Sequence, residues 1–241
     1  MTTRFTGGWL PVMLFVGHQK DYKMDKHIEQ LIEKMTTPNQ PNVDPENQVS
    51  WSACAIAEKL NDLYIIDDLL EYLPNAPNIE QEWVPYTHKS AAYYIIGKIS
   101  KNNRSMLLAE KLLDLLLREP NVSCKFILLE AIAEMPRIGP IDVSSIFPLL
   151  RSDNYLIQRA SIYAVSCSTK PMAESAIINL LEEPVGNENY ISCYGTLSRI
   201  GTERAIPYIE KGLNSSVRHQ RVCAQLSIDS INRRLFAQQK H

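Results

Sequence analysis

The sequence is poor in the residues that usually mark a catalytic centre. Its five histidines are scattered, none has a second histidine at metal-binding spacing, and no His-Glu dipeptide occurs. A Gly-rich phosphate loop, a GxSxG elbow and an HExxH motif are also missing. Only nine glycines among 241 residues argue against a low-complexity chain. We therefore expect a folded, non-catalytic protein that needs no cofactor and no metal.

Long apolar runs are missing as well. The longest run near the start, residues 9–17, falls far short of the roughly 20 residues that a membrane span needs, so we expect no span. We interpret residues 1–24 as an N-terminal cap on the first helices, or as an arm that docks on a partner. The five cysteines form no CxxC pair, which favours buried free thiols in a reducing cytoplasm.

Helical periodicity dominates the remaining sequence. Apolar residues recur every three to four positions, and strand-like alternation is missing over any useful length. Polar or proline-rich turns separate these segments, so that they fall into pairs. The expected pairs are 26–35 with 49–60, 63–73 with 87–99, 106–117 with 123–135, 143–150 with 155–166, 173–181 with 189–200, and 201–213 with 217–234.

The pairs repeat at a regular interval. Four apolar residues hold the same late position in successive second helices, at separations of 36, 33 and 32 residues, and a small residue follows each of them. Such spacing is typical of stacked two-helix repeats that share one continuous core. We predict one all-α domain over residues 1–241, in which residues 25–241 form the repeats of a right-handed α-solenoid of about six helical hairpins. The four anchor residues are Ile96, Ile132, Val165 and Leu197.

The sixth pair carries a family resemblance. Gly201 is followed by Ala205, Ile209 and Leu213 at steps of four, and Val217-Arg218 comes after a short polar turn. This pattern resembles the HEAT repeat, in particular its PBS-lyase-like variant. The resemblance implies an α-solenoid, a fold that serves many unrelated binding functions.

Three relatives of that repeat suggest other functions. The deoxyhypusine hydroxylases carry His-Glu dyads, which this chain lacks. The HEAT-like DNA glycosylases resemble a basic clamp lined by tryptophans, whereas Trp9, Trp51 and Trp83 all lie in an acidic first third. A role as a chromophore lyase subunit rests only on the name of the repeat variant. A nucleic-acid-binding protein or base-excision glycosylase therefore remains one alternative, and a lyase subunit another.

We expect the second helices to line the concave face and to present polar and aromatic side chains there. Counting back seven residues from each anchor gives a polar or aromatic position, and tyrosines recur ten and three residues before the anchors. Tyrosine and arginine dominate binding hot spots. The alternative is that the rings pack between helices and only their hydroxyls reach water. The expected partner-binding residues are Tyr86, Lys89, Tyr93, Lys125, Tyr155, Gln158, Arg159, Tyr190, Tyr194, Arg218 and Arg221.

Charge is distributed unevenly along a chain whose net charge is only −2. Residues 25–82 carry a net charge of −9, and residues 199–241 carry +5. Such a dipole would orient a partner of mixed charge, whereas a nucleic-acid binder needs a basic stripe along the whole groove. We therefore expect a cytoplasmic scaffold whose concave face binds one partner protein. It would act as an adaptor, an assembly factor or an immunity protein that neutralises a toxin.

Overall fold

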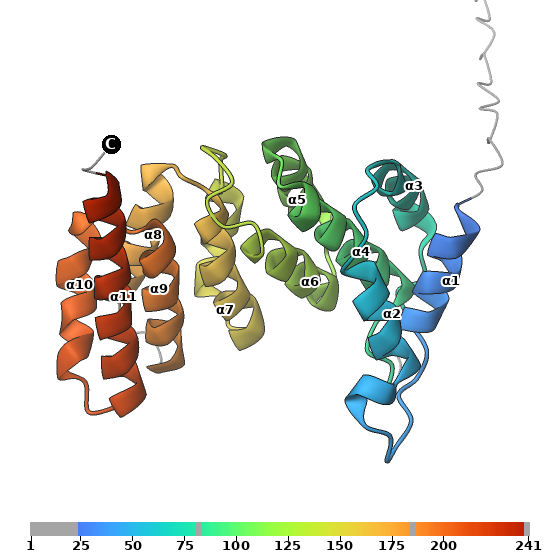
Figure 1. Cartoon of the computed structure of the whole chain (residues 1–241), viewed down its shortest axis with the longest axis horizontal. Helices are drawn as coiled ribbons and strands as arrows, with labels where there is room; N and C mark the ends of the chain where they lie inside the picture. The colour runs from blue at the N-terminus through green and yellow to red at the C-terminus, as the bar shows by residue number, and fades with distance from the viewer. Residues whose placement is uncertain (1–23, 81–82, 184–186, 239–241) are drawn as a thin grey trace, which may run out of the picture.

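The computed structural model describes residues 24–80, 83–183 and 187–238 (Figure 1). The expected N-terminal cap or arm, including the apolar run 9–17, lies outside the described residues except for Met24. Among the described residues, regular structure is helical, apart from one isolated bridge between Gly139 and Ser168. No helix in these ranges is long and apolar enough to cross a membrane.

Six helical pairs follow one another along the chain, as the sequence predicts. The first helices are α1 (Lys26–Met35), α3 (Tyr64–Tyr72), α5 (Met106–Arg118), η3 (Ser144–Arg151), α8 (Pro171–Glu182) and α10 (Ile206–Glu210). The second helices are α2 (Val49–Ala57), α4 (His88–Asn103), α6 (Val122–Ala133), α7 (Tyr155–Ala164), α9 (Asn187–Ile200) and α11 (Arg218–Gln238). Short 3-10 turns complete the set: η1 (Pro45–Asn47), η2 (Leu73–Asn75), η4 (Val165–Cys167), η5 (Glu203–Ala205) and η6 (Lys211–Asn214).

Local sequence explains where the second helices begin. Thr87 and Ser90 form a reciprocal capping box at the start of α4. Asn121 and Asn154 accept hydrogen bonds from the backbone amides of Cys124 and Ile157, and so cap α6 and α7. Each cap follows a turn, so the second helices start at corresponding points of successive repeats.

Two first helices differ from the expectation, and proline accounts for both. The segment expected as a helix over 143–150 is a 3-10 helix, η3, with Pro148 inside it. Proline has no N–H to donate to the carbonyl four residues earlier, which disfavours a regular α-helix. The segment expected over 201–213 begins only at Glu203 and is divided into η5, α10 and η6, with Pro207 in the first turn of α10.

The core runs continuously between the pairs. All four anchor residues are buried, and each second helix packs against the next, from α4 through α6, α7 and α9 to α11. Gly97 follows the anchor Ile96 where α4 meets α6. A Cβ atom at Gly97 would lie 2.5 Å from the Cβ atom of Ala131, so only glycine fits at this approach. In Figure 1 the pairs stand side by side in one curved row, with α4 and α6 on its inner side below α3 and α5.

Candidate binding groove

Three neighbouring cavities form a groove across the second helices α2, α4, α6 and the start of α7. Their volumes are about 490, 160 and 420 Å³, and Tyr86 lines all three. Tyr94 is shared by the first and second cavities, and Phe126 by the second and third. Because the cavities share their walls, we treat them as one surface, the aromatic groove.

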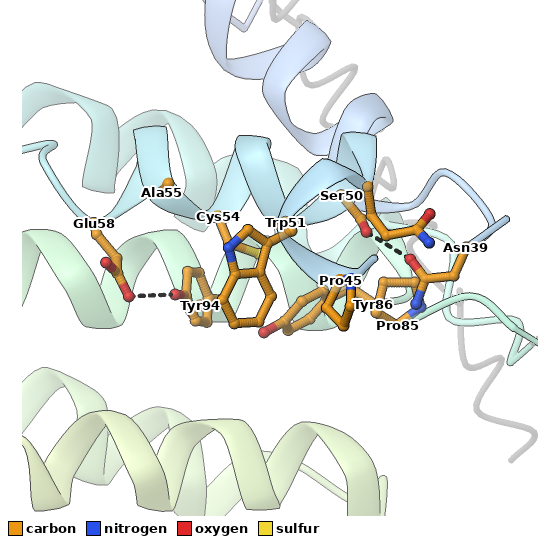
Figure 2. A pocket seen from close by; sticks show the side chains of 11 residues that line it. Asn39, Pro45, Ser50, Trp51, Cys54, Ala55, Glu58, Pro85, Tyr86 and Tyr94 are labelled. Carbon is orange, nitrogen blue, oxygen red and sulfur yellow. Dashed lines mark hydrogen bonds between the residues drawn. The ribbon is translucent and has the colours of Figure 1, made fainter. Parts of the chain in front are cut away.

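The first and largest cavity lies between α2 and α4 (Figure 2). Trp51 comes from α2, and 58% of its surface is exposed. Tyr86 precedes α4 and packs against Tyr94 on that helix, with ring centroids 5.3 Å apart and planes tilted by 57°. Pro45 and Pro85 add rigid apolar walls. The cavity therefore offers three aromatic rings to an apolar or aromatic side chain.

Charged groups fix the tyrosines and form a polar rim. The hydroxyl of Tyr94 donates to a carboxylate oxygen of Glu58 at 3.2 Å. The ammonium group of Lys98 lies 4.8 Å from the centroid of the Tyr94 ring and 2.7 Å from Glu134. These contacts join α2, α4 and α6 through side chains of the groove. They hold the Tyr94 ring in place without any ligand, and a side chain that is already ordered loses less entropy on binding.

The third cavity lies where α4, α6 and α7 begin. Phe126 and Ile127 of α6 and Leu156 of α7 provide its apolar wall, and Leu156 is exposed. Glu130 lies one turn further along α6. Burial raises the pKa of the Glu130 carboxyl, and the positive charge of Arg159 partly offsets this effect. The negative charge of Glu130 on α6 and the positive charge of Arg159 on α7 therefore attract each other.

The groove is chemically suited to recognition. Burial raises the pKa of both Tyr86 and Tyr94, so both stay neutral well above neutral pH. Cys54 lines the first cavity, and burial raises its pKa, which disfavours the reactive thiolate. Across the described ranges, no group of three or more His, Cys, Asp or Glu side chains is placed to hold a metal ion.

Three of the residues expected to contact a partner lie in or beside this groove. Tyr86 is at its centre. The guanidinium group of Arg159 lies 5.8 Å from the centroid of the Tyr155 ring. Tyr155 is exposed at the start of α7, next to Leu156 of the third cavity.

Two tyrosines that we expected to contact a partner from the concave face belong to the core instead, which corrects that prediction. Tyr93 is 4% exposed, and its hydroxyl donates to the buried carboxylate of Glu119 at 2.6 Å. Tyr194 is 1% exposed, and its ring lies against Gly212 of the neighbouring helical pair. Both rings fill space between helices, as in the alternative interpretation, so neither can offer a face to a partner.

Two polar residues expected on the concave face point elsewhere, which is a second correction. Lys89 forms an ion pair with Glu119 at 2.9 Å and lines a separate cavity between α3, α4 and α5. The side-chain amide of Gln158 donates to the Leu150 carbonyl and accepts from Asn189, so it links the fourth and fifth pairs. Their polar atoms are used within the fold.

The remaining expected residues lie outside the three cavities. Lys125 on α6 and Tyr190 on α9 are half-buried. Arg218 is exposed at the start of α11. Arg221 donates to the carbonyl groups of Ser215 and Ser216 and so caps the preceding turn. Most residues that line the groove were not predicted from the sequence to bind a partner: Trp51, Tyr94, Phe126, Ile127 and Leu156.

Comparison with known proteins bears on the fold. Neither the protein-family models nor the curated proteins contain a significant match to this chain. Among solved structures, a designed armadillo repeat protein in complex with the peptide (KR)4 is similar over 85% of this chain and 99% of its own, with a TM-score of 0.52 and 15% identity. By fold, the chain is a helical-repeat α-solenoid of the armadillo and HEAT type. The predicted fold class is thereby confirmed.

Two further structures show weaker similarity. A second designed armadillo repeat protein covers 85% of this chain and 99% of its own, with a TM-score of 0.45 and 16% identity. The complex of CpcE and CpcF of phycocyanin lyase from Nostoc sp. PCC7120 contains a chain that covers 92% of this one and 100% of its own. Its TM-score is 0.37 and its identity is 14%.

Proposed function

We propose that this protein is a non-catalytic scaffold that binds a segment of one partner protein in the aromatic groove. The observation that carries the proposal is the set of three connected cavities around Tyr86. Their walls combine half-buried aromatic and aliphatic side chains with the exposed side chains of Trp51 and Leu156. An unpaired apolar surface of this kind is typical of a site that a partner covers. Tryptophan and tyrosine in pockets are also the usual anchors of protein interfaces.

The shape and chemistry of the groove favour an extended segment with bulky side chains. The cavities lie in series along four helices, so successive side chains of an extended chain could enter them in turn. Glu58, Lys98 and Glu130 line the cavities beside the apolar side chains and supply charged groups of both signs. The designed armadillo protein with the same fold was solved with a peptide bound, which supports a peptide-like ligand here.

We further propose a cytoplasmic location and one of three cellular roles. All five cysteines are free, and Cys124, Cys167 and Cys193 are buried, which fits a reducing compartment such as the cytoplasm. A rigid scaffold with one preformed groove could serve as an adaptor, as an assembly factor or as an immunity protein that covers a toxin. Identification of the bound segment would distinguish these three roles.

The test is a selection from a random peptide library displayed on phage, followed by fluorescence polarisation with the selected peptides. We expect the double variant Trp51→Ala/Tyr86→Ala to weaken binding at least about tenfold, which corresponds to about 1.4 kcal/mol. The matched control is Tyr64→Ala, because Tyr64 is an equally exposed ring on α3 outside the groove.

Three results would contradict the proposal. They are failure to select any peptide, equal affinity of the groove variant and the wild type, and an equal loss in the control. The same protein should be tested against nucleic acid at low and high salt. Binding to nucleic acid that falls steeply with salt would favour the alternative function instead.

A further inference from the structure

A second, chemically different cavity lies near the C-terminal end of the solenoid. Its volume is about 200 Å³, and it lies where the loop after α6, the start of α8 and the end of α9 meet. At about 30 Å³ per water molecule, it has room for several waters or for one phosphate group with part of its hydration. Three cations, Arg137, Lys170 and Arg204, line it together with one acid, Glu174.

The positive charges in this cavity are not neutralised by ion pairs. Every ion pair found among the described residues involves other groups, and none includes Arg137, Lys170 or Arg204. Glu174 is 4% exposed, and its carboxylate accepts hydrogen bonds from the amide and hydroxyl of Thr202 at 2.6 and 2.8 Å. Thr202 therefore fixes this carboxylate in place, and its single negative charge stands against the three cations that line the cavity.

Arg137 has a structural role, which it shares with Arg234 outside the cavity lining and which separates it from Lys170 and Arg204. Arg137 donates to the carbonyl of Arg199, and Arg234 donates to the carbonyls of Ser198 and Gly201, at the end of α9. Burial and the neighbouring positive charge of Arg137 lower the pKa of Arg234. Positive charge is thus crowded here, while Lys170 and Arg204 have no such role in capping α9.

The start of α8 adds to the same positive field. Lys170 is the N-cap residue of this 12-residue helix, and no side chain accepts a hydrogen bond from its first amides. A cation at the N-terminus of a helix lies at the positive end of the helix dipole, which is unfavourable, and Glu174 in the first turn of α8 offsets this effect only in part. The pKa of nearby Asp142 is lowered mainly by hydrogen bonds with Ser144 and only in small part by Lys170.

We propose that this cavity is a binding site for a phosphate-type oxyanion, either free or as the ester of a small molecule. Lys170 and Arg204 would supply charge-assisted hydrogen bonds, and Arg137 would contribute a guanidinium nitrogen that the Arg199 carbonyl does not use. Bound anion would relieve the repulsion among the cations. The site is independent of the aromatic groove, which lies on α2, α4, α6 and the start of α7.

The experiment is isothermal titration calorimetry of the full chain with pyrophosphate and, separately, with ribose 5-phosphate. We expect saturable binding that weakens at least about tenfold in the double variant Lys170→Gln/Arg204→Gln. The charge-matched control is Lys34→Gln/Lys59→Gln, because both lysines are exposed and lie in the first helical pair. Whichever ligand binds more tightly identifies the source of the phosphate group.

Two outcomes would overturn the proposal. One is the lack of saturable binding of either ligand up to about 10 mM. The other is an equal affinity for the double variant and the control. Thermal melting with and without pyrophosphate gives a second readout, since a ligand that binds only the folded state raises the melting temperature. That increase should be kept in the control and lost in the double variant.

Discussion

Two glycine-to-alanine substitutions on second helices should change stability in opposite directions. Gly97 is buried in α4, and a Cβ atom there would lie 2.5 Å from the Cβ atom of Ala131. Carbon atoms pack best at about 3.5–4.0 Å, so α4 and α6 would have to separate by about 1 Å. Gly195 lies in α9, where an added Cβ atom would meet the Tyr163 ring at 3.5 Å, an ordinary contact distance.

The magnitudes follow from packing and helix propensity. Overpacking a well-filled core costs about 1–3 kcal/mol, whereas replacing glycine by alanine inside a helix gains about 1 kcal/mol. We therefore expect Gly97→Ala to lower the free energy of unfolding by up to about 2 kcal/mol. For Gly195→Ala only the helix-propensity gain remains, so that variant should be more stable by about 0.5–1 kcal/mol.

Urea denaturation followed by far-ultraviolet circular dichroism would measure both changes. The compensating variant Ala131→Gly should restore part of the stability of Gly97→Ala, because it removes the atom that the new methyl group meets. A Gly97→Ala protein more stable than the wild type would refute the close α4–α6 approach. So would a Gly195→Ala protein that loses as much stability as Gly97→Ala.

Two further predictions concern buried ionisable groups. Burial raises the pKa of Glu119, but hydrogen bonds from Tyr93, Lys89 and the Asn121 amide lower it below its ordinary value overall. Its contribution to stability is therefore complete above about pH 4.3 and is lost as the pH falls through the lower folded pKa. Glu119→Gln should be less stable at neutral pH and should lose less stability on acidification, and acid titrations of both proteins would show whether it does. Brief alkylation of the native protein at pH 8, read by mass spectrometry, should modify only Cys54 and Cys223. The other three thiols are those of Cys124, Cys167 and Cys193, which are buried and have pKa values raised to about 12. Labelling of any of these three would contradict their burial.

The fold could be predicted from the sequence because the inter-repeat contacts repeat. Ile96, Ile132, Val165 and Leu197 are buried in equivalent positions, and their regular spacing indicates that the helical pairs are stacked repeats. The number and order of the pairs followed from apolar periodicity and the turns between segments. Prolines limited the accuracy of the boundaries. Pro148 and Pro207 lie in segments with good apolar periodicity, yet they turn one helix into a 3-10 helix and divide the other.

The groove could not be located in this way, for a geometric reason. Seven residues span almost two complete helical turns, so counting back seven from a buried anchor returns to nearly the same face of the helix. Lys89 and Gln158 were selected by that count, and both bond within the fold. The groove instead uses residues two positions from the anchors, on the opposite face: Tyr94, Lys98, Glu130 and Glu134.

Tyr93 shows why residue type was misleading as well. Tyrosine is common at binding surfaces, but a tyrosine ring also fills a gap between helices when a buried acceptor lies within reach of its hydroxyl. Glu119 is that acceptor, 26 positions later in the sequence. Only the stacking of the second pair on the third brings these two residues together, and no local pattern encodes that contact.

The two proposed sites belong to different repeats, and this separation makes their tests independent. Each pair of a solenoid contacts mainly its neighbours, so a substitution in one pair has little direct effect two pairs away. Trp51 and Tyr86 lie in the first two pairs, whereas Lys170 and Arg204 precede the first helices of the fifth and sixth. Combining the groove variant with the cation variant should therefore add their effects on stability. A marked departure from additivity would mean that the solenoid couples the aromatic groove to the cationic cavity, and that occupation of one site influences the other.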